Sequence, residues 1–377
     1  MFESTVALKL DLLNKGISFS PDFLDYYQHQ EELIEKRRAY GTGDSSVLGK
    51  SVKVPQEIFL GEGVISAVNH QPSSPWRIEL AEGAPVIRGR HSTFPVSFPQ
   101  RPKSYGKKLS NQELFEQTVT VYGDTTLGVF SPGHCYYFND GRECKFCSLG
   151  PARENLSDHR MKIKSTLASE AINLATELEP GRYKRVLVNG GTIPNYDKGF
   201  SIHMDLIQGI RESANSAALE YHLISMPPKN FQLFERFKAT GNKLAMSLEI
   251  FDPDEFAKTC PGKAQDYTRP RFLEAFSAAV ETIGHGNVYV GFVAGMEPLS
   301  SLLEGIEYFG RLGVVPAVAV FHPDAGSKYE HWPRPSVDYL NAVGKKMAEV
   351  YQREKFTPLI EGSGRNSLDT EAYRGGF

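Results

Sequence analysis

Between about residues 125 and 355 the chain alternates short apolar runs with helical patterns, which limits its fold more than any other feature. We predict buried strands at six runs: 127–132, 184–190, 220–226, 243–250, 287–294 and 314–321. Apolar residues recur at a spacing of three to four in predicted helices at 165–178, 299–312 and 337–351, and further helices fit at about 201–213, 228–240 and 270–283. Strands that alternate with helices build βαβ units around a parallel sheet.

The fold class predicted from this pattern is α/β. Six units are fewer than the eight of a complete barrel, so the pattern leaves a partial (βα)6 barrel and an open doubly wound sheet as alternatives. In both architectures ligands bind at the carboxyl ends of the strands.

The first third of the chain reads differently from the rest. A helical pattern at 21–38 precedes short β-like runs at 51–60, 77–81 and 93–98, which Gly, Pro and Ser interrupt. We therefore predict three parts, with a mixed α/β accessory region before the core and a tail after it: 1–120, 121–355 and 356–377. We expect the accessory region and the tail to cover the mouth of the barrel.

Composition excludes several classes of partner. The net charge is −3, with 40% apolar and 23% charged residues, so nothing indicates binding to nucleic acid or to an anionic membrane. No apolar run reaches the length of a membrane span, and the first thirty residues do not resemble a secretory signal. Four cysteines in 377 residues are typical of a reducing compartment, so we expect a cytoplasmic protein.

Three of the four cysteines, Cys135, Cys144 and Cys147, lie within the segment 133–150, which directly follows the first predicted strand. Thiolates bind iron–sulfur clusters, zinc or copper(I). A [4Fe–4S] cluster held by three cysteines keeps one iron open for another ligand, and this interpretation is favoured. A zinc site would need a fourth ligand, such as Cys260 or a distant histidine. Three unrelated reduced thiols are the remaining alternative.

The segment resembles the cluster loop of the radical SAM superfamily. In that superfamily an aromatic residue commonly precedes the last cysteine, as Phe146 does here. The first gap has eight residues instead of three, so the motif is a variant C-x8-C-x2-C, and Asn139-Asp140-Gly141 inside the gap indicates a turn. The segment Cys260-Pro-Gly-Lys263 is similar to segments of the biotin-synthase-like and lipoyl-synthase-like branch. The resemblance implies a partial TIM-type barrel, a [4Fe–4S] cluster and S-adenosylmethionine.

The same resemblance suggests roles for residues that end the later strands. The candidates to contact the amino group of S-adenosylmethionine are Gly190, Gly191 and Thr192, and Ser225 is the candidate for its methionyl or ribose part. Glu249 is the candidate to bind the ribose. The adenine would contact Val293 and Gly295 and would be bracketed by Phe321 and His322. Each has a plain structural alternative: a turn for the glycines, a helix cap for Ser225, a salt bridge for Glu249, a buried strand for Val293 and a loop histidine for His322.

Cys260 stands more than a hundred residues from the other three cysteines. As a catalytic residue it could donate a hydrogen atom, carry sulfur or bind substrate, and it could equally be a small buried side chain.

By resemblance, we expect an enzyme in which the cluster reductively cleaves S-adenosylmethionine to a 5′-deoxyadenosyl radical, which abstracts hydrogen from a small-molecule substrate. The expected partners are that substrate and an electron donor of the flavodoxin or ferredoxin type; the sequence indicates neither the substrate nor the oligomeric state. Two other interpretations remain: a zinc-dependent hydrolase on an α/β barrel, and a non-catalytic iron–sulfur binding or electron-transfer protein.

Overall fold

The computed structural model describes residues 4–33, 53–151, 162–213, 218–362 and 366–377. Within them the main sheet has seven strands in the order β13-β12-β11-β10-β9-β8-β7, parallel except for the antiparallel edge strand β7. Its strands are β7 (Thr120–Tyr122), β8 (Thr126–Phe130), β9 (Arg185–Asn189), β10 (Glu220–Ile224), β11 (Lys243–Glu249), β12 (Val288–Ala294) and β13 (Val315–Val320). The six predicted strands are β8 to β13.

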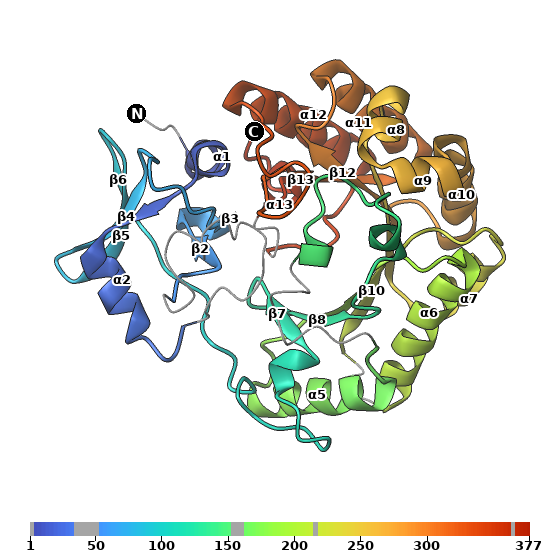
Figure 1. Ribbon diagram of the computed structural model, residues 1–377, viewed down its shortest axis with the longest axis horizontal. Helices are drawn as coiled ribbons and strands as arrows, with labels where there is room; N and C mark the ends of the chain where they lie inside the picture. The colour runs from blue at the N-terminus through green and yellow to red at the C-terminus, as the bar shows by residue number, and fades with distance from the viewer. Residues whose placement is uncertain (1–3, 34–52, 152–161, 214–217, 363–365) are drawn as a thin grey trace.

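Helices surround the outer face of this curled sheet (Figure 1). They are α5 (Ser165–Leu178), α6 (Tyr196–Ser213), α7 (Leu233–Thr240), α8 (Pro253–Thr259), α9 (Pro261–Asp266), α10 (Arg269–Ile283), α11 (Leu299–Leu312) and α12 (Val337–Glu354). The sheet therefore forms a partial barrel, and the predicted α/β fold is confirmed. No helix in the described ranges is long and apolar enough to span a membrane.

The helices of the barrel differ from the prediction in two places. α7 begins at Leu233 instead of 228, because Asn230 forms a turn in which its side chain accepts a hydrogen bond from Gln232 N–H and its carbonyl accepts one from Leu233 N–H. α8 and α9 were not predicted. Each is short and has a proline at its first position, where the missing N–H is of no consequence.

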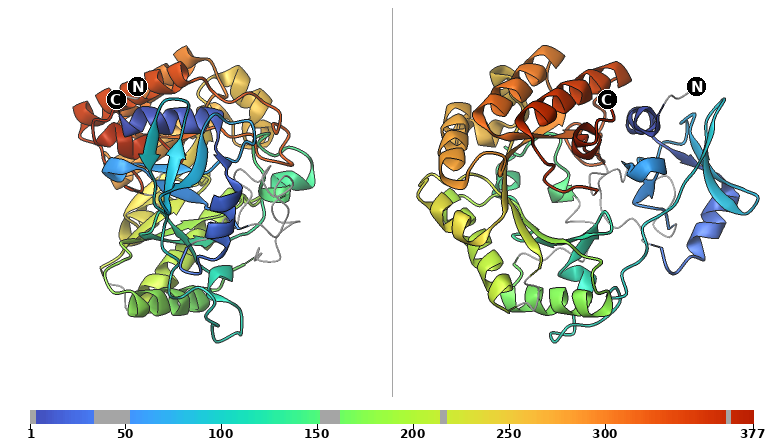
Figure 2. Two further views of the ribbon diagram at one scale, coloured as in Figure 1. Left: turned by 90° about the vertical axis from the view of Figure 1, so that its left-hand side faces the viewer. Right: turned by 180° about the vertical axis from the view of Figure 1, so that it is seen from behind.

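The described residues between Val6 and Phe98 contain a second, smaller core beside the barrel (Figure 2), whereas Leu109, Phe115 and Val119 already belong to the core of the barrel, and the predicted boundary at 120 stays a prediction. The elements before Phe98 are α1 (Thr5–Lys15), β1 (Ser18–Phe19), α2 (Pro21–Gln28), β2 (Glu57–Phe59), η1 (Gly61–Gly63), β3 (Ile65–Ala67), β4 (Arg77–Ala81), β5 (Ala84–Arg88) and β6 (Thr93–Pro95), and η2 (Phe115–Gln117) leads into the barrel. β1, β4, β5 and β6 form one sheet, and β2 pairs with β3. The predicted helix at 21–38 ends at Gln28, and its last part, like the start of the run 51–60, lies outside the described residues.

Residues 357–361 of the tail lie at the opposite end of the barrel from where we expected the tail. The amino ends of three strands contact its backbone: Tyr289 Oη donates to Thr357 O at 2.8 Å, Lys243 Nζ to Pro358 O at 2.9 Å and Arg185 Nη1 to Glu361 O at 3.2 Å. The expectation that the tail covers the mouth was therefore wrong for this stretch, which instead closes the amino ends of the strands.

The last residues of the tail border the free edge of β13. Leu368 N–H donates to Val318 O, and α13 (Asp369–Tyr373) follows. Glu371 on α13 forms an ion pair of 2.8 Å with Lys9 of α1, and both side chains are almost fully buried, at 3% and 0% exposure. This pair joins the two ends of the chain beside β13.

Candidate functional site

The cysteine loop, residues 133–150, leaves the carboxyl end of β8 and passes along the end of β9. Tyr136 N–H donates to Thr192 O at 2.9 Å, and the eight-residue gap begins with the 3-10 helix η3 (Tyr136–Asn139). The first cysteine, Cys135, therefore lies at the carboxyl ends of the strands, the edge where ligands bind in parallel α/β folds.

Two predicted residues, Gly190 and Gly191, allow this close approach. A Cβ atom on Gly190 would lie 2.5 Å from Ser131 O, and one on Gly191 would lie 2.1 Å from His134 O. No side chain fits there. The glycine pair thus has a role within the chain itself, which is to admit the backbone of the cysteine loop, and its contact with a cofactor stays a prediction.

The end of the cysteine loop rests on the junction of α8 and α9. Lys145 N–H donates to Thr259 O at 2.9 Å, and Gly262 N–H donates to Arg142 O at 3.0 Å. Cys260, at this junction, is fully buried, and burial and the neighbouring Cys144 thiol raise its pKa. The fold thereby brings the distant fourth cysteine to the cluster loop.

The thiols of the loop act on one another electrostatically. Burial and the neighbouring Cys144 raise the pKa of Cys135 and of Cys147. The pKa of Cys144 is instead lowered, first by its hydrogen bond with Cys260 and then by the charge of Lys263, against the effect of burial.

Within the described residues, however, no three His, Cys, Asp or Glu side chains are grouped so that they could hold a metal ion. Ligation by Cys135, Cys144 and Cys147 therefore stays a prediction. Phe146, the aromatic residue before the last cysteine, is half-buried and packs against the main core.

Glu249 ends β11 in a left-handed conformation, with φ of 77°, where the pairing with β12 shifts its register. Its Oε1 accepts a hydrogen bond of 2.8 Å from Lys263 Nζ, which also donates to Ser247 O at 2.7 Å. Burial lowers the pKa of Lys263, but Glu249 outweighs it and the pKa lies above its ordinary value. The salt-bridge interpretation of Glu249 thus has an observed partner, and the ribose contact stays a prediction.

A small pocket gathers four predicted residues, Gly190, Gly191, Thr192 and Ser225, together with His203 of α6. Ser225 is not a helix cap, because α7 begins at Leu233 with Gln232 at its N-cap, and the Oγ of Ser225 instead lies 2.9 Å from His203 Nδ1. His203 Nε2 lies 2.9 Å from Ser131 O. This carbonyl needs a donor, so Nε2 carries the proton and Nδ1 accepts from Ser225. Burial lowers the pKa of His203 to about 4, which keeps the ring neutral.

The carboxyl end of β12 is closely packed. Val293 is buried, and a Cβ on Gly295, whose φ is 102°, would lie 3.0 Å from Pro335. Glu297 is buried too, and it accepts hydrogen bonds from the backbone N–H groups of Phe251 and Asp252. Glu297 thus anchors the turn after β11, and the adenine contact of Val293 and Gly295 stays a prediction.

The segment after β13 is tied to the cysteine loop. Phe321 is buried, and His322 lies between Asp324 Oδ1 at 3.1 Å and Arg334 Nη2 at 3.1 Å. The other carboxylate oxygen of Asp324 accepts a hydrogen bond of 2.8 Å from Ser148, next to Cys147. Phe321 and His322 therefore reach the same end of the barrel as the cysteines, and their contact with the adenine stays a prediction.

A tyrosine network that sequence reasoning missed holds the first half of the cysteine loop. Tyr137 Oη lies 2.6 Å from Tyr196 Oη of α6, and Tyr136 Oη donates to Asp266 Oδ2 of α9 at 2.5 Å. Arg142 Nη1 donates to the other oxygen of Asp266 at 2.7 Å. In the sequence, only the adjacent tyrosines Tyr136 and Tyr137 in the eight-residue gap could have indicated this network.

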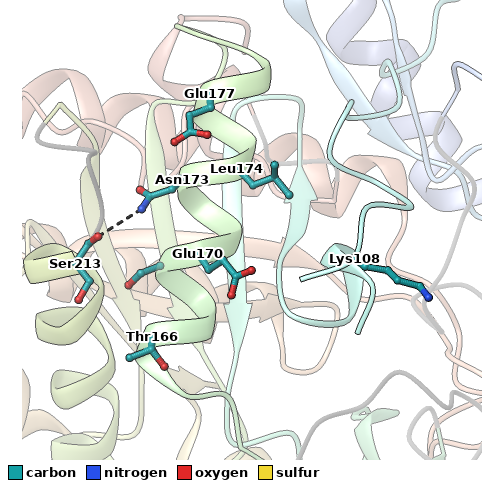
Figure 3. A pocket seen from close by; sticks show the side chains of 8 residues that line it. Lys108, Thr166, Glu170, Asn173, Leu174, Glu177 and Ser213 are labelled. Atoms are coloured by element: carbon teal, nitrogen blue, oxygen red, sulfur yellow. Dashed lines mark hydrogen bonds between the residues drawn. The ribbon is translucent and has the colours of Figure 1, made fainter. Parts of the chain in front are cut away.

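Another pocket lies along α5 and contains none of the predicted residues (Figure 3). Its side chains include Glu170, Glu177 and Lys108, and Asn173 Nδ2 donates to Ser213 O at 3.4 Å. Nothing in this pocket resembles the chemistry of the cysteine loop.

Comparison with known proteins gives one curated relative, bacteriochlorophyllide c C-7(1)-hydroxylase of Chlorobaculum limnaeum, which is 30% identical over 258 residues. The match covers 65% of this chain and 64% of that protein, slightly less than two thirds of its length. No established family profile matches the chain.

Solved structures with related folds include the radical SAM enzyme coproporphyrinogen III oxidase (HemN) of Escherichia coli, 14% identical, with a TM-score of 0.40 and coverage of 62% of this chain and 54% of that chain. A radical SAM methyltransferase of Sphaerobacter thermophilus is 13% identical, with a TM-score of 0.44 and coverage of 79% and 82%. The partial barrel, with its cysteine loop after the first parallel strand, agrees with the fold that the resemblance to the radical SAM superfamily implies, whereas membership of that superfamily, the branch and the cluster motif stay predictions.

Proposed function

We propose that this chain is a radical SAM enzyme acting on a small molecule, with a [4Fe–4S] cluster on Cys135, Cys144 and Cys147. The observation that carries the proposal is the position of the cysteine loop, which begins at the carboxyl end of β8 and lies over the glycine pair after β9. With cluster and S-adenosylmethionine bound, reductive cleavage supplies a 5′-deoxyadenosyl radical that abstracts hydrogen from the substrate.

The residues around the loop have distinct tasks in this proposal. Gly190, Gly191, Thr192 and Ser225, which line one pocket, hold the methionyl part of S-adenosylmethionine. His203 is a positioning residue, because its neutral ring joins Ser225 to Ser131, between β8 and the loop.

Val293, Gly295, Phe321 and His322 hold the adenine at the adjoining strands. Cys260 is buried against Cys144. That position favours a role beside the cluster over direct contact with a freely diffusing substrate.

The electron comes from a donor of the flavodoxin or ferredoxin type, in the cytoplasm. The curated relative is named as a hydroxylase of bacteriochlorophyllide c, so this compound is the first substrate to test.

The test is anaerobic incubation of the reconstituted, dithionite-reduced chain with S-adenosylmethionine, with and without candidate substrates. We expect 5′-deoxyadenosine to form, and a true substrate to increase its rate. Absence of 5′-deoxyadenosine from a chain that holds a full cluster would favour the non-catalytic iron–sulfur alternative, and a colourless protein that contains zinc would favour the hydrolase.

A further inference from the structure

Cys144 and Cys260 are neighbours in the fold although more than a hundred residues separate them in the sequence, and the proposed function does not use this meeting of two thiols. Cys260 is fully buried, whereas Cys144 is partly exposed and packs against the core that contains Cys260. Both are free thiols. The pair therefore joins one thiol that solutes can reach to one that is protected from them.

Two backbone hydrogen bonds place the two cysteines opposite each other. Lys145 N–H donates to Thr259 O at 2.9 Å, and Gly262 N–H donates to Arg142 O at 3.0 Å. These bonds have the register of an antiparallel pair in which the two cysteines fall opposite each other. Residues opposite each other in such a pair have Cα atoms about 4.5–5.5 Å apart, and a disulfide needs about 4.4–6.8 Å. The backbone therefore already provides the separation that a disulfide requires.

A third segment keeps this arrangement in place. Tyr329, which follows β13, donates its N–H to Lys145 O at 3.0 Å, and its Oη lies 3.1 Å from Thr259 Oγ1. A Cβ atom on Gly262 would lie 2.7 Å from Arg142 O, so the two backbones approach as closely as a glycine allows. The residues beside the two cysteines are thus fixed to each other and to a common partner.

We propose that Cys144 and Cys260 form a disulfide when the chain meets a small-molecule disulfide such as oxidised glutathione, and that this bond competes with the cluster for Cys144. The competition rests on the proposed function, which assigns Cys144 to the cluster. The partly exposed Cys144 is the thiol that the oxidant reaches first, and the buried Cys260 is the resolving thiol, an arrangement typical of redox-sensitive cysteines.

Two exchange steps balance the reaction. The Cys144 thiolate attacks one sulfur of oxidised glutathione, so that a mixed disulfide forms and one glutathione leaves. The Cys260 sulfur then attacks the Cys144 sulfur and displaces the second glutathione. The two cysteines lose two electrons and two protons, which the two glutathione thiols take up. Cys144 is then unable to bind iron until a thiol reductant opens the disulfide.

The experiment maps the disulfide in the full-length chain, which is freed of metal with a chelator, reduced, incubated with oxidised glutathione, alkylated and digested. Trypsin cleaves after Lys145 and so separates Cys144 from Cys147. We expect free thiols to fall from four to about two per chain, with the peptide of Cys144 joined to that of Cys260. A bond from Cys144 to Cys147, or no bond at Cys144, would overturn the inference. Cys260→Ser should stop the reaction at a mixed disulfide of Cys144 with glutathione, whereas Cys135→Ser, the matched control, should form the same bond as the unchanged chain.

Iron uptake tests the competition with the cluster. During anaerobic reconstitution without a thiol reductant, the oxidised chain should take up about tenfold less iron than the reduced chain, and dithiothreitol should restore the uptake. Equal uptake by the two forms, with the disulfide present, would overturn the competition. A reduced chain that takes up no iron or sulfide would instead contradict the proposed function, and the mapped disulfide would then still support the pairing of the two cysteines.

Discussion

The amino and carboxyl ends of the barrel strands differ in the kinds of contact that their side chains make. At the amino ends, Tyr289, Lys243 and Arg185 donate to backbone carbonyls of the tail, so polar groups meet ordinary structural partners. At the carboxyl ends, Glu249 has a left-handed backbone conformation and forms a largely buried ion pair with Lys263, and the buried Cys260 lies beside the cysteine loop. The comparison shows that contacts at the amino ends stabilise the fold, whereas the arrangement at the carboxyl ends costs stability. We therefore expect the chemistry at the carboxyl ends.

The largest effect should follow from removing a thiol at the carboxyl end. We expect Cys144→Ala to abolish cluster binding and the cleavage of S-adenosylmethionine, measured as iron per chain and as 5′-deoxyadenosine. Tyr289→Phe, which removes one hydroxyl at the amino end, should keep both. A Cys144→Ala chain with full iron content would contradict the assignment of the cluster to the carboxyl ends of the strands.

The next effect concerns stability alone. Lys9→Met leaves Glu371 buried without its partner, which should lower the free energy of unfolding by about 3–5 kcal/mol. Iron bound per folded chain should not change, because the pair lies beside β13 and away from the cysteine loop. Urea unfolding measures the first quantity. Lys258→Met, which breaks an exposed pair with Glu255, is the control and should cost less than about 1 kcal/mol.

Two buried histidines predict how stability depends on pH. Burial lowers the pKa of His203 to about 4 and that of His222 to about 3, from an ordinary value of 6.5. Between these pH values the histidines are protonated in the unfolded chain but not in the folded chain. The stability that the neutral histidines allow is therefore present above pH 6.5 and is lost as the pH falls toward 4. At pH 5 we expect each histidine to lower the free energy of unfolding by about 2 kcal/mol relative to pH 7.

Urea unfolding at the two pH values checks this loss. His203→Gln should remove about half of this pH-dependent loss of stability. The substitution lies at the end of the barrel that carries the cysteines. If the free energy of unfolding depended on pH in the same way with and without His203, groups other than His203 would be responsible for the loss.

The smallest effect should come from crowding the cysteine loop. A methyl group on Gly191 would meet His134 O at 2.1 Å, so Gly191→Ala should displace the loop and lower iron retention about tenfold. Gly61→Ala is the control, since its Cβ would meet only Thr5 at 3.5 Å. Iron retention after gel filtration measures the difference, and equal retention in both variants would mean that the loop does not need its place over β9.

The sequence predicted the strands better than the site. Continuous apolar runs identify buried parallel strands locally, and the strand 243–250 and the helix 299–312 agree closely with β11 and α11. The position of the tail was misjudged, because residues 357–361 carry no periodic pattern that shows which end of the barrel they contact.

The partners of the candidate site residues depend on tertiary contacts. Glu249 was recognised as a carboxylate at a strand end, yet its partner Lys263 lies in a short helix that periodicity does not reveal. His203 reads as an ordinary residue of an amphipathic helix, and only the fold brings it to Ser225. The meeting of Cys260 with Cys144, more than a hundred residues apart, likewise has no local signal.

The most direct test of the central claim is the iron and sulfide content of the chain purified without oxygen. The account predicts about four of each per chain. A chain without iron and sulfide, or one with zinc in their place, would contradict it.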